Sequence, residues 1–108
     1  MWTIETIVDD FLTEAQEDWI GLWAIVGAVR DRLNLTSNEE IKVRTLAVVR
    51  GLLDRGLWPG NFSNDRKFSP WDLPDAAACL ARIDSEWDVT KGYPVALDAI
   101  CWFSWKNK

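Results

Sequence analysis

Apolar residues recur at helical spacing through the first third of the chain and predict two helices, Thr3 to Ala15 and Glu17 to Leu33. Thr3 has the side chain and the position to cap the first turn of the first helix. The apolar stripe of the second helix includes Trp19 and Trp23, and further apolar residues extend around its circumference. We therefore expect the second helix to be central and both tryptophans to lie in the core.

A third helix is predicted between Ser37 and Gly56. Ser37 and Glu40 have the spacing of a capping box, in which each side chain accepts a hydrogen bond from the other residue's backbone amide. Gly56 is suited to the left-handed conformation that ends a helix. The segment that follows, Leu57 to Phe62, has the composition of an extended strand, and the turn dipeptide Pro59-Gly60 is expected to interrupt it.

The second half of the chain predicts a polar loop at residues 63–67, a fourth helix and a final strand. Asp72 and Asp75 mark the start of this helix, and Gly92 and Pro94 mark its end. The apolar stripe of the helix is Ala76, Leu80, Ile83 and Trp87. The tail, Ala99 to Trp105, predicts a strand that pairs antiparallel with Leu57 to Phe62. The expected fold class is α+β, mostly α, in a single domain of residues 1–108 with three N-terminal helices, a strand, an inserted helix and a strand.

This order of elements resembles the winged-helix superfamily over about residues 17–62. The stretch from Glu40-Ile41 to Gly56-Leu57-Trp58 looks like the recognition helix and the first wing strand of that family. The usual wing is a short hairpin, whereas residues 63–98, with a helix among them, separate the two predicted strands. The resemblance implies the fold and leaves the ligand open, because the same fold serves DNA readers, protein-docking modules and inhibitors.

The composition argues against catalysis. The 108 residues contain no histidine, which excludes Ser-His, Cys-His and His-ligated metal mechanisms. The glycines are scattered and form no phosphate-binding or dinucleotide-binding motif. Only carboxylates remain for acid–base work, and a chain this short has little room for a substrate cleft between them. We therefore expect a protein that is not an enzyme and that uses no cofactor or metal.

Cysteine usage, hydropathy and the N-terminal charge bear on the compartment. Cys79 and Cys101 have no partner pattern for zinc or a disulfide framework, so we expect buried thiols of a reducing cytoplasm. The longest apolar run, Trp19 to Val29, is shorter than the roughly 20 residues of a membrane span. Residues 1–12 carry acidic but no basic side chains, the reverse of a signal peptide. A cytoplasmic protein without a membrane partner is expected.

Acidic residues dominate the first 18 positions, which contain six carboxylates and no lysine or arginine in a chain of net charge −5. Two interpretations remain open: a solvated helix face that maintains solubility, or a docking surface that steers a basic protein. Under the second interpretation the candidate protein-binding residues are Asp9, Asp10, Glu14, Glu17 and Asp18.

The predicted third helix and the loop beyond it carry the opposite charge. If the helix at 39–55 binds DNA, the candidate contacts are Lys42, Arg44, Arg50, Arg66 and Lys67. Against this, Glu39 and Glu40 lie at the helix N-terminus, where a DNA-binding helix needs donors. A solvated polar face and a protein contact are the other interpretations of these residues.

Eight tryptophans are unusual in a chain of this length. Trp87, like Trp19 and Trp23, falls on an apolar stripe and is expected in the core. Trp58, Trp71 and Trp105 flank turns and the chain end, where an indole is harder to enclose, so each is a candidate for packing or for anchoring a partner.

The favoured function is a non-catalytic protein-binding module. In size, acidity and aromatic content the chain is similar to the small immunity and antitoxin proteins of bacterial toxin systems, which implies a basic protein as partner. The alternative is a winged-helix transcriptional regulator that binds DNA. The protein is expected to be a monomer, or a homodimer in which Ala99 to Trp105 serves as an edge strand and pairs with its copy.

Overall fold

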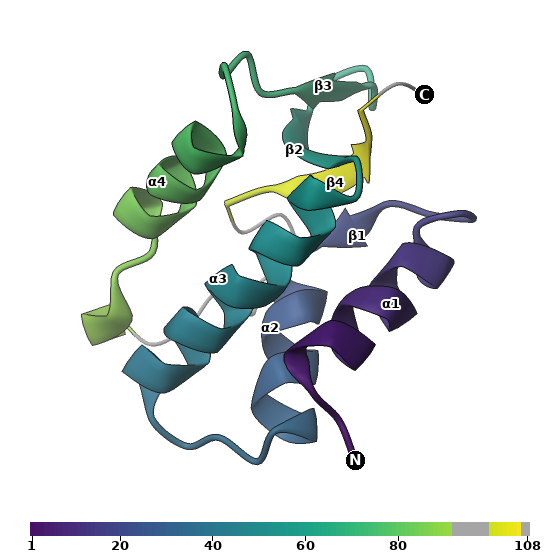
Figure 1. Ribbon diagram of the computed structural model, residues 1–108. Helices are drawn as coiled ribbons and strands as arrows, with labels where there is room; N and C mark the ends of the chain where they lie inside the picture. Colours follow the sequence, from purple (N-terminus) through teal and green to yellow (C-terminus); the bar gives the residue numbers. More distant parts are fainter. Residues whose placement is uncertain (92–99, 107–108) are drawn as a thin grey trace.

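The computed structural model describes residues 1–91 and 100–106 and has a mostly helical α+β architecture, which confirms the predicted fold class (Figure 1). In chain order the elements are α1 (Ile4–Glu14), β1 (Ile20–Gly21), α2 (Leu22–Arg32), α3 (Asn38–Asp54), β2 (Leu57–Phe62), β3 (Phe68–Pro70), α4 (Ala76–Glu86), the short 3-10 helix η1 (Val89–Lys91) and β4 (Trp102–Trp105). Figure 1 shows the strands gathered at one end of the helices, with α1 and α4 on opposite sides of α3.

Side chains cap three of the helices at the predicted places. Thr3 accepts from the Thr6 amide, and Thr6 accepts from the Thr3 amide at 2.8 Å, so the reciprocal capping box occurs at α1. At α3, Ser37 accepts from the Glu40 amide at 3.3 Å. The Glu40 carboxylate lies 3.7 Å from Arg44 and does not complete a box, which corrects the prediction for this helix. Asp75 caps α4 by accepting from the Ala78 amide.

The predicted second helix was too long at its N-terminus. The Asp18 carboxylate accepts from the backbone amide of Trp19 at 2.8 Å, and the chain then extends through Ile20 and Gly21 to pair with β4. The helix begins only at Leu22. The helical spacing of apolar residues predicted that this helix begins at Glu17. Ile20 and Gly21 instead form backbone hydrogen bonds in the sheet, which are incompatible with helical ones. The central helix is α3, which contacts α1, α2 and α4.

Four antiparallel strands form a sheet in the order β1-β4-β2-β3. The predicted pairing of the last strand with Leu57–Phe62 is confirmed, with Leu57 opposite Trp105 and Gly60 opposite Trp102. Pro59 and Gly60 continue the strand, because the Pro59 carbonyl accepts from the Trp71 amide and Gly60 pairs on both sides. They were wrongly predicted to interrupt it.

Two further predictions about the strands are corrected. β4 lies between β1 and β2, so it is an interior strand of the sheet and not the edge strand that was predicted to pair with a second copy. The predicted polar loop at 63–67 is the turn of a hairpin whose second strand, β3, was missed. Gly56 takes φ +107° at the end of α3, as predicted. Helix α4 ends at Glu86, and the predicted stop signals Gly92 and Pro94, like Ala99, lie outside the described residues.

The two faces of the sheet differ in what covers them. Side chains alternate between faces along each strand, so the register assigns Ile20, Leu57 and Phe103 to one face. All three are at most 2% exposed and belong to the core that the helices share, so we call this the inner face. Buried Trp87, the C-cap residue of α4, joins the same core as predicted. The opposite, outer face carries aromatic side chains, described next.

Candidate protein-binding surface

Aromatic rings cluster on the outer face of the sheet. Phe62 of β2 is at the centre, with its ring centroid 5.0 Å from Trp19, 5.8 Å from Phe68 and 5.4 Å from Trp102. Each pair meets edge to face, the geometry that aromatic quadrupoles favour. The cross-strand pairs Phe62 with Phe68 and Gly60 with Trp102 place these rings on one face. We call Trp19, Phe62, Phe68 and Trp102 the aromatic face.

Two glycines let the rings lie against the backbone. A Cβ at position 60 would be 2.6 Å from Cζ of Phe68 and 2.9 Å from Cα of Pro70. A Cβ at position 21 would be 2.6 Å from Cδ1 of Trp23, so that indole covers the glycine. Only a residue without a side chain permits these approaches, and an aromatic ring shields the bare backbone in return.

Trp19 and Trp23 are the two most exposed aromatic residues near the sheet, at 46% and 37%. Both were predicted to be core residues of one long helix. The prediction was wrong because Trp19 precedes β1 and follows the strand alternation, which turns its ring toward Phe62. Trp23 is in the first turn of α2 and lies over Gly21.

Hollows flank Trp19 on both sides. One, of about 270 Å³, lies over β2, β3 and β4 and is lined by Trp58, Phe68, Ser104 and other residues. A second, of about 300 Å³, is lined by Trp19, Trp23 and Trp102 together with Glu14 and Asp18. A smaller hollow of about 100 Å³ adds Glu17. Three of the predicted acidic residues therefore border the aromatic face, and we call Glu14, Glu17 and Asp18 the acidic rim.

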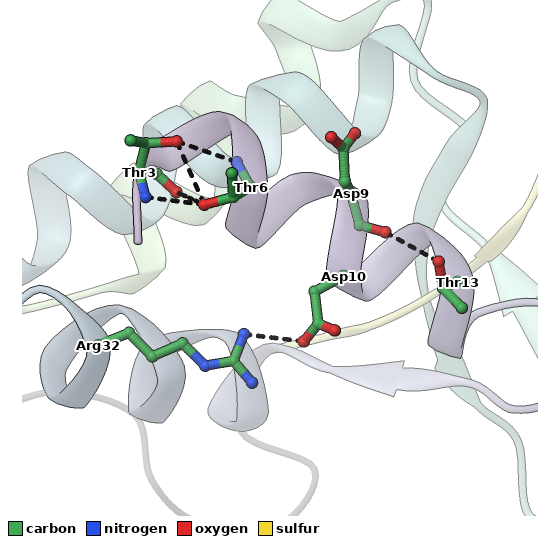
Figure 2. Close-up of polar contacts among 6 residues, drawn as sticks. All are labelled: Thr3, Thr6, Asp9, Asp10, Thr13 and Arg32. Atoms are coloured by element: carbon green, nitrogen blue, oxygen red, sulfur yellow. Dashed lines mark hydrogen bonds and ion pairs between the residues drawn. The ribbon is translucent and has the colours of Figure 1, made fainter. Parts of the chain in front are cut away.

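The remaining acidic candidates are engaged within the molecule. Asp10 is 2.8 Å from Nη1 of Arg32, and Asp9 is 3.5 Å from Nη1 of Arg55 (Figure 2 shows the first pair). Figure 2 also shows that the two carboxylates point away from each other across α1. Among the described residues, no lysine or arginine forms an ion pair with the acidic rim. The predicted acidic group thus divides into two carboxylates that have a basic partner, Asp9 and Asp10, and three that have none among the described residues.

The three tryptophans predicted at turns and the chain end are largely enclosed. Trp58 and Trp71 are each 6% exposed, which favours packing, one of the two roles that the sequence left open for them. Trp58 donates to the Trp71 carbonyl at 2.9 Å, and Trp71 donates to the side chain of Asn61 at 2.6 Å. Trp105 is half-buried, and its indole N–H donates to the Ala15 carbonyl at the end of α1. Their spacing near turns did not reveal these buried acceptors.

Most basic residues proposed for DNA have partners in the fold. Nζ of Lys42 is 2.5 Å from Asp84 and also donates to the carbonyls of Asp84 and Trp87, so this lysine fastens the end of α4 to α3. Arg44 pairs with Glu40, and Arg50 with Asp54, on the exposed side of α3. Arg66 and Lys67 lie exposed in the turn between β2 and β3. Nζ of Lys67 lies 3.9 Å from Asp65. The structure therefore separates the basic candidates and pairs four of them, Lys42, Arg44, Arg50 and Lys67, with carboxylates.

Both cysteine thiols lie in the core of the described structure. Burial raises the pKa of the Cys79 and Cys101 thiols above the usual range, which disfavours the nucleophilic thiolate. No group of metal-ligating side chains comes together within residues 1–91 and 100–106. Within the same residues, no helix has both the length and the apolar character needed to cross a bilayer. The aromatic face and the acidic rim beside it are the most distinctive surface of the described residues.

Comparisons of the chain with protein-family models, with curated proteins and with solved structures found no match. The aromatic face was missed by sequence reasoning, although a signal for it exists. Once the β2–β3 turn and the register of β4 are known, the alternation of side chains along each strand assigns Phe62, Phe68 and Trp102 to the face opposite the inner-face residues.

Proposed function

We propose that this protein is a non-catalytic binding module that docks a basic protein on its aromatic face and acidic rim. The observation that carries the proposal is the position of Trp19, 46% exposed, between the other aromatic rings and the carboxylates of Glu14 and Asp18. Exposed tryptophan on a well-packed aromatic platform is typical of interface anchors. Clustered carboxylates beside such a platform attract cationic partners and increase their association rate.

The favoured biological role is that of a small immunity-type or antitoxin-type inhibitor acting in the cytoplasm. The acidity of the chain and its two buried free thiols support this role. An inhibitor of this kind covers a basic surface of its target and needs no chemistry of its own. The proposed partner is therefore a protein whose docking surface is rich in lysine and arginine.

Capture from a nuclease-treated native lysate tests the proposal when three forms of the tagged protein are compared. The wild type is set against Glu14→Gln/Glu17→Gln/Asp18→Asn, which neutralises the acidic rim. The matched control is Asp9→Asn/Asp10→Asn, which removes two carboxylates that already have internal partners. Quantitative mass spectrometry at low and high salt then identifies and measures what each form retains.

We expect a basic protein that the wild type and the control retain and the rim variant loses, with retention falling as salt rises. Equal retention by all three forms would remove the acidic rim from the proposal. Recovery of nucleic acid before nuclease treatment, with a loss of bound protein afterwards, would favour the alternative of DNA binding through the helix at 39–55. The hairpin of β2 and β3 supports the winged-helix resemblance on which that alternative depends, because a short hairpin is the usual wing.

A further inference from the structure

Within residues 1–91 and 100–106, basic side chains of the protein lie over the rings of three tryptophans. The guanidinium carbon of Arg32 lies 4.1 Å from the ring centroid of Trp2, and that of Arg82 lies 3.8 Å from Trp71. Nζ of Lys106 lies 4.1 Å from the ring centroid of Trp58. All three distances are within the range at which a cation is attracted to the face of an indole. A basic side chain thus lies over the exposed indole of Trp2 and over the largely buried indoles of Trp58 and Trp71.

Trp19 and Trp23 differ from these three. Both are more than a third exposed, and the described lysines and arginines place no cation over either ring. The hollow of about 300 Å³ between them is bordered by the carboxylates of Glu14 and Asp18 and by a third indole, Trp102. The faces of indoles and carboxylates both attract positive charge, so the side chains of Trp19, Trp23, Trp102, Glu14 and Asp18 all favour a cation in this hollow.

The walls of this hollow are held in place. The Asp18 carboxylate accepts from the Trp19 backbone amide at 2.8 Å, which fixes the acid next to the ring. Trp23 lies against Gly21, and Gly21 pairs with Trp102 across β1 and β4. Trp19 in turn meets Phe62 edge to face. A ligand that enters meets rings and carboxylates that need little reordering, which lowers the cost of binding.

We propose that the hollow bounded by Glu14, Asp18, Trp19, Trp23 and Trp102 binds an arginine side chain of the partner protein. A guanidinium is planar, so it stacks on an indole while its N–H groups donate to carboxylates at its edge. An ammonium is a compact, strongly hydrated charge and gains less from the rings. This site deepens the proposed function and rests on it, since it supplies the anchor for the basic partner.

The test uses small probes and ¹⁵N-labelled protein, so it does not depend on knowing the partner. The probes are N-acetyl-arginine amide, the neutral isostere N-acetyl-citrulline amide and N-acetyl-lysine amide, each titrated at constant ionic strength. Indole N–H resonances of the eight tryptophans are assigned by Trp→Phe substitutions. Trp2 serves as an internal control because Arg32 already covers its ring.

We expect the arginine probe to shift the Trp19 and Trp23 resonances saturably and to leave Trp2 unchanged. Glu14→Gln/Asp18→Asn should weaken this binding about tenfold, since charge-assisted hydrogen bonds are lost. The control Asp9→Asn/Asp10→Asn should bind the probe as the wild type does.

Three results would overturn the site: no shift at Trp19 or Trp23, equal shifts with citrulline, or an undiminished affinity in Glu14→Gln/Asp18→Asn. Equal affinity for the lysine probe would overturn the assignment to arginine. These failures are separable from failure of the proposed function. Suppose that the capture experiment finds a basic partner that the rim variant loses, but that the arginine probe shifts neither Trp19 nor Trp23. The proposed docking surface would then stand, and only the arginine-binding site would be rejected.

Discussion

The inner and outer faces of the same sheet are both rich in apolar side chains, yet these side chains differ in how far they are exposed to solvent. On the inner face, Leu57 and Phe103 are fully buried under the helices. On the outer face, Phe62, Phe68 and Trp102 are half-buried, and Trp19 is 46% exposed. Among the described residues, the outer rings are covered mainly by one another, through edge-to-face contacts around Phe62.

This difference separates stability from recognition within four short strands. A buried side chain contributes by leaving water on folding, whereas a half-exposed ring keeps part of that free energy for a later partner. Substitutions on the inner face should therefore affect unfolding most, and substitutions on the outer face should affect binding most.

The largest effect is expected from Phe103→Ala. Removing a fully buried ring from the centre of β4 should lower the free energy of unfolding by about 3–5 kcal/mol. Urea denaturation monitored by circular dichroism measures the change. If the alanine variant does not fold, Phe103→Leu keeps most of the volume and should lose less than about 1.5 kcal/mol. A loss below about 1 kcal/mol in the alanine variant would contradict the assignment of Phe103 to the core.

Gly60→Ala should lower the free energy of unfolding by about 1–3 kcal/mol, because its Cβ would collide with Phe68 and with the backbone at Pro70. The matched control is Gly27→Ala within α2, where a Cβ would meet nothing within 4 Å. That change should raise stability by about 0.5–1 kcal/mol through helix propensity. Thermal and urea unfolding of the pair distinguish a close approach from a general glycine effect. Equal changes in both variants would argue against the close packing of Phe68 on β2.

Trp19→Ala should cost only about 1 kcal/mol of stability, roughly the value of one edge-to-face aromatic contact. The same change should abolish retention of the basic partner in the capture experiment, because it removes the ring shared by all three hollows. Urea denaturation and capture are measured on the same preparation. The division between the faces would fail if this variant lost several kcal/mol, or if it kept the partner at the wild-type level.

The smallest effect on stability is expected from the acidic rim. Glu14→Gln/Glu17→Gln/Asp18→Asn should change the free energy of unfolding by less than about 0.5 kcal/mol, as is usual for surface positions. Asp10→Asn breaks the pair with Arg32 and should cost up to about 1 kcal/mol at low salt, falling as salt is added. Urea denaturation at two salt concentrations tests this order. A larger loss in the rim variant than in Asp10→Asn would show that the rim carboxylates have structural roles.

Local patterns in the sequence predicted the elements well where one signal dominated. As predicted, Thr3, Ser37 and Asp75 cap the N-termini of α1, α3 and α4, and Gly56 follows the end of α3. The pairing of the last strand with Leu57–Phe62 was also predicted. These features depend on neighbours in the chain or on the simplest pairing of two strands, so a single sequence contains enough information.

The site was harder to predict because it is made by long-range pairing. Two residues, Ile20 and Gly21, join β4 across some 80 positions, and this short strand removes Trp19 from the helical stripe. Pro59 and Gly60 resemble a turn locally, but β3 and β4 hold them in the sheet from both sides. The burial of Trp58 and Trp71 depends on acceptors that only the folded chain supplies. Of the predicted site residues, Glu14, Glu17 and Asp18 border the aromatic face.

Position-resolved photo-crosslinking tests whether the outer face is the surface on which a basic protein docks. Benzoylphenylalanine replaces Phe62 in one form and Val43, 64% exposed on α3, in the other, and both are irradiated in the native lysate. We predict an adduct with one basic protein at position 62, lost when Glu14, Glu17 and Asp18 are neutralised, and no adduct with it at position 43. An adduct at position 43 alone, or equal adducts at both positions, would contradict the account.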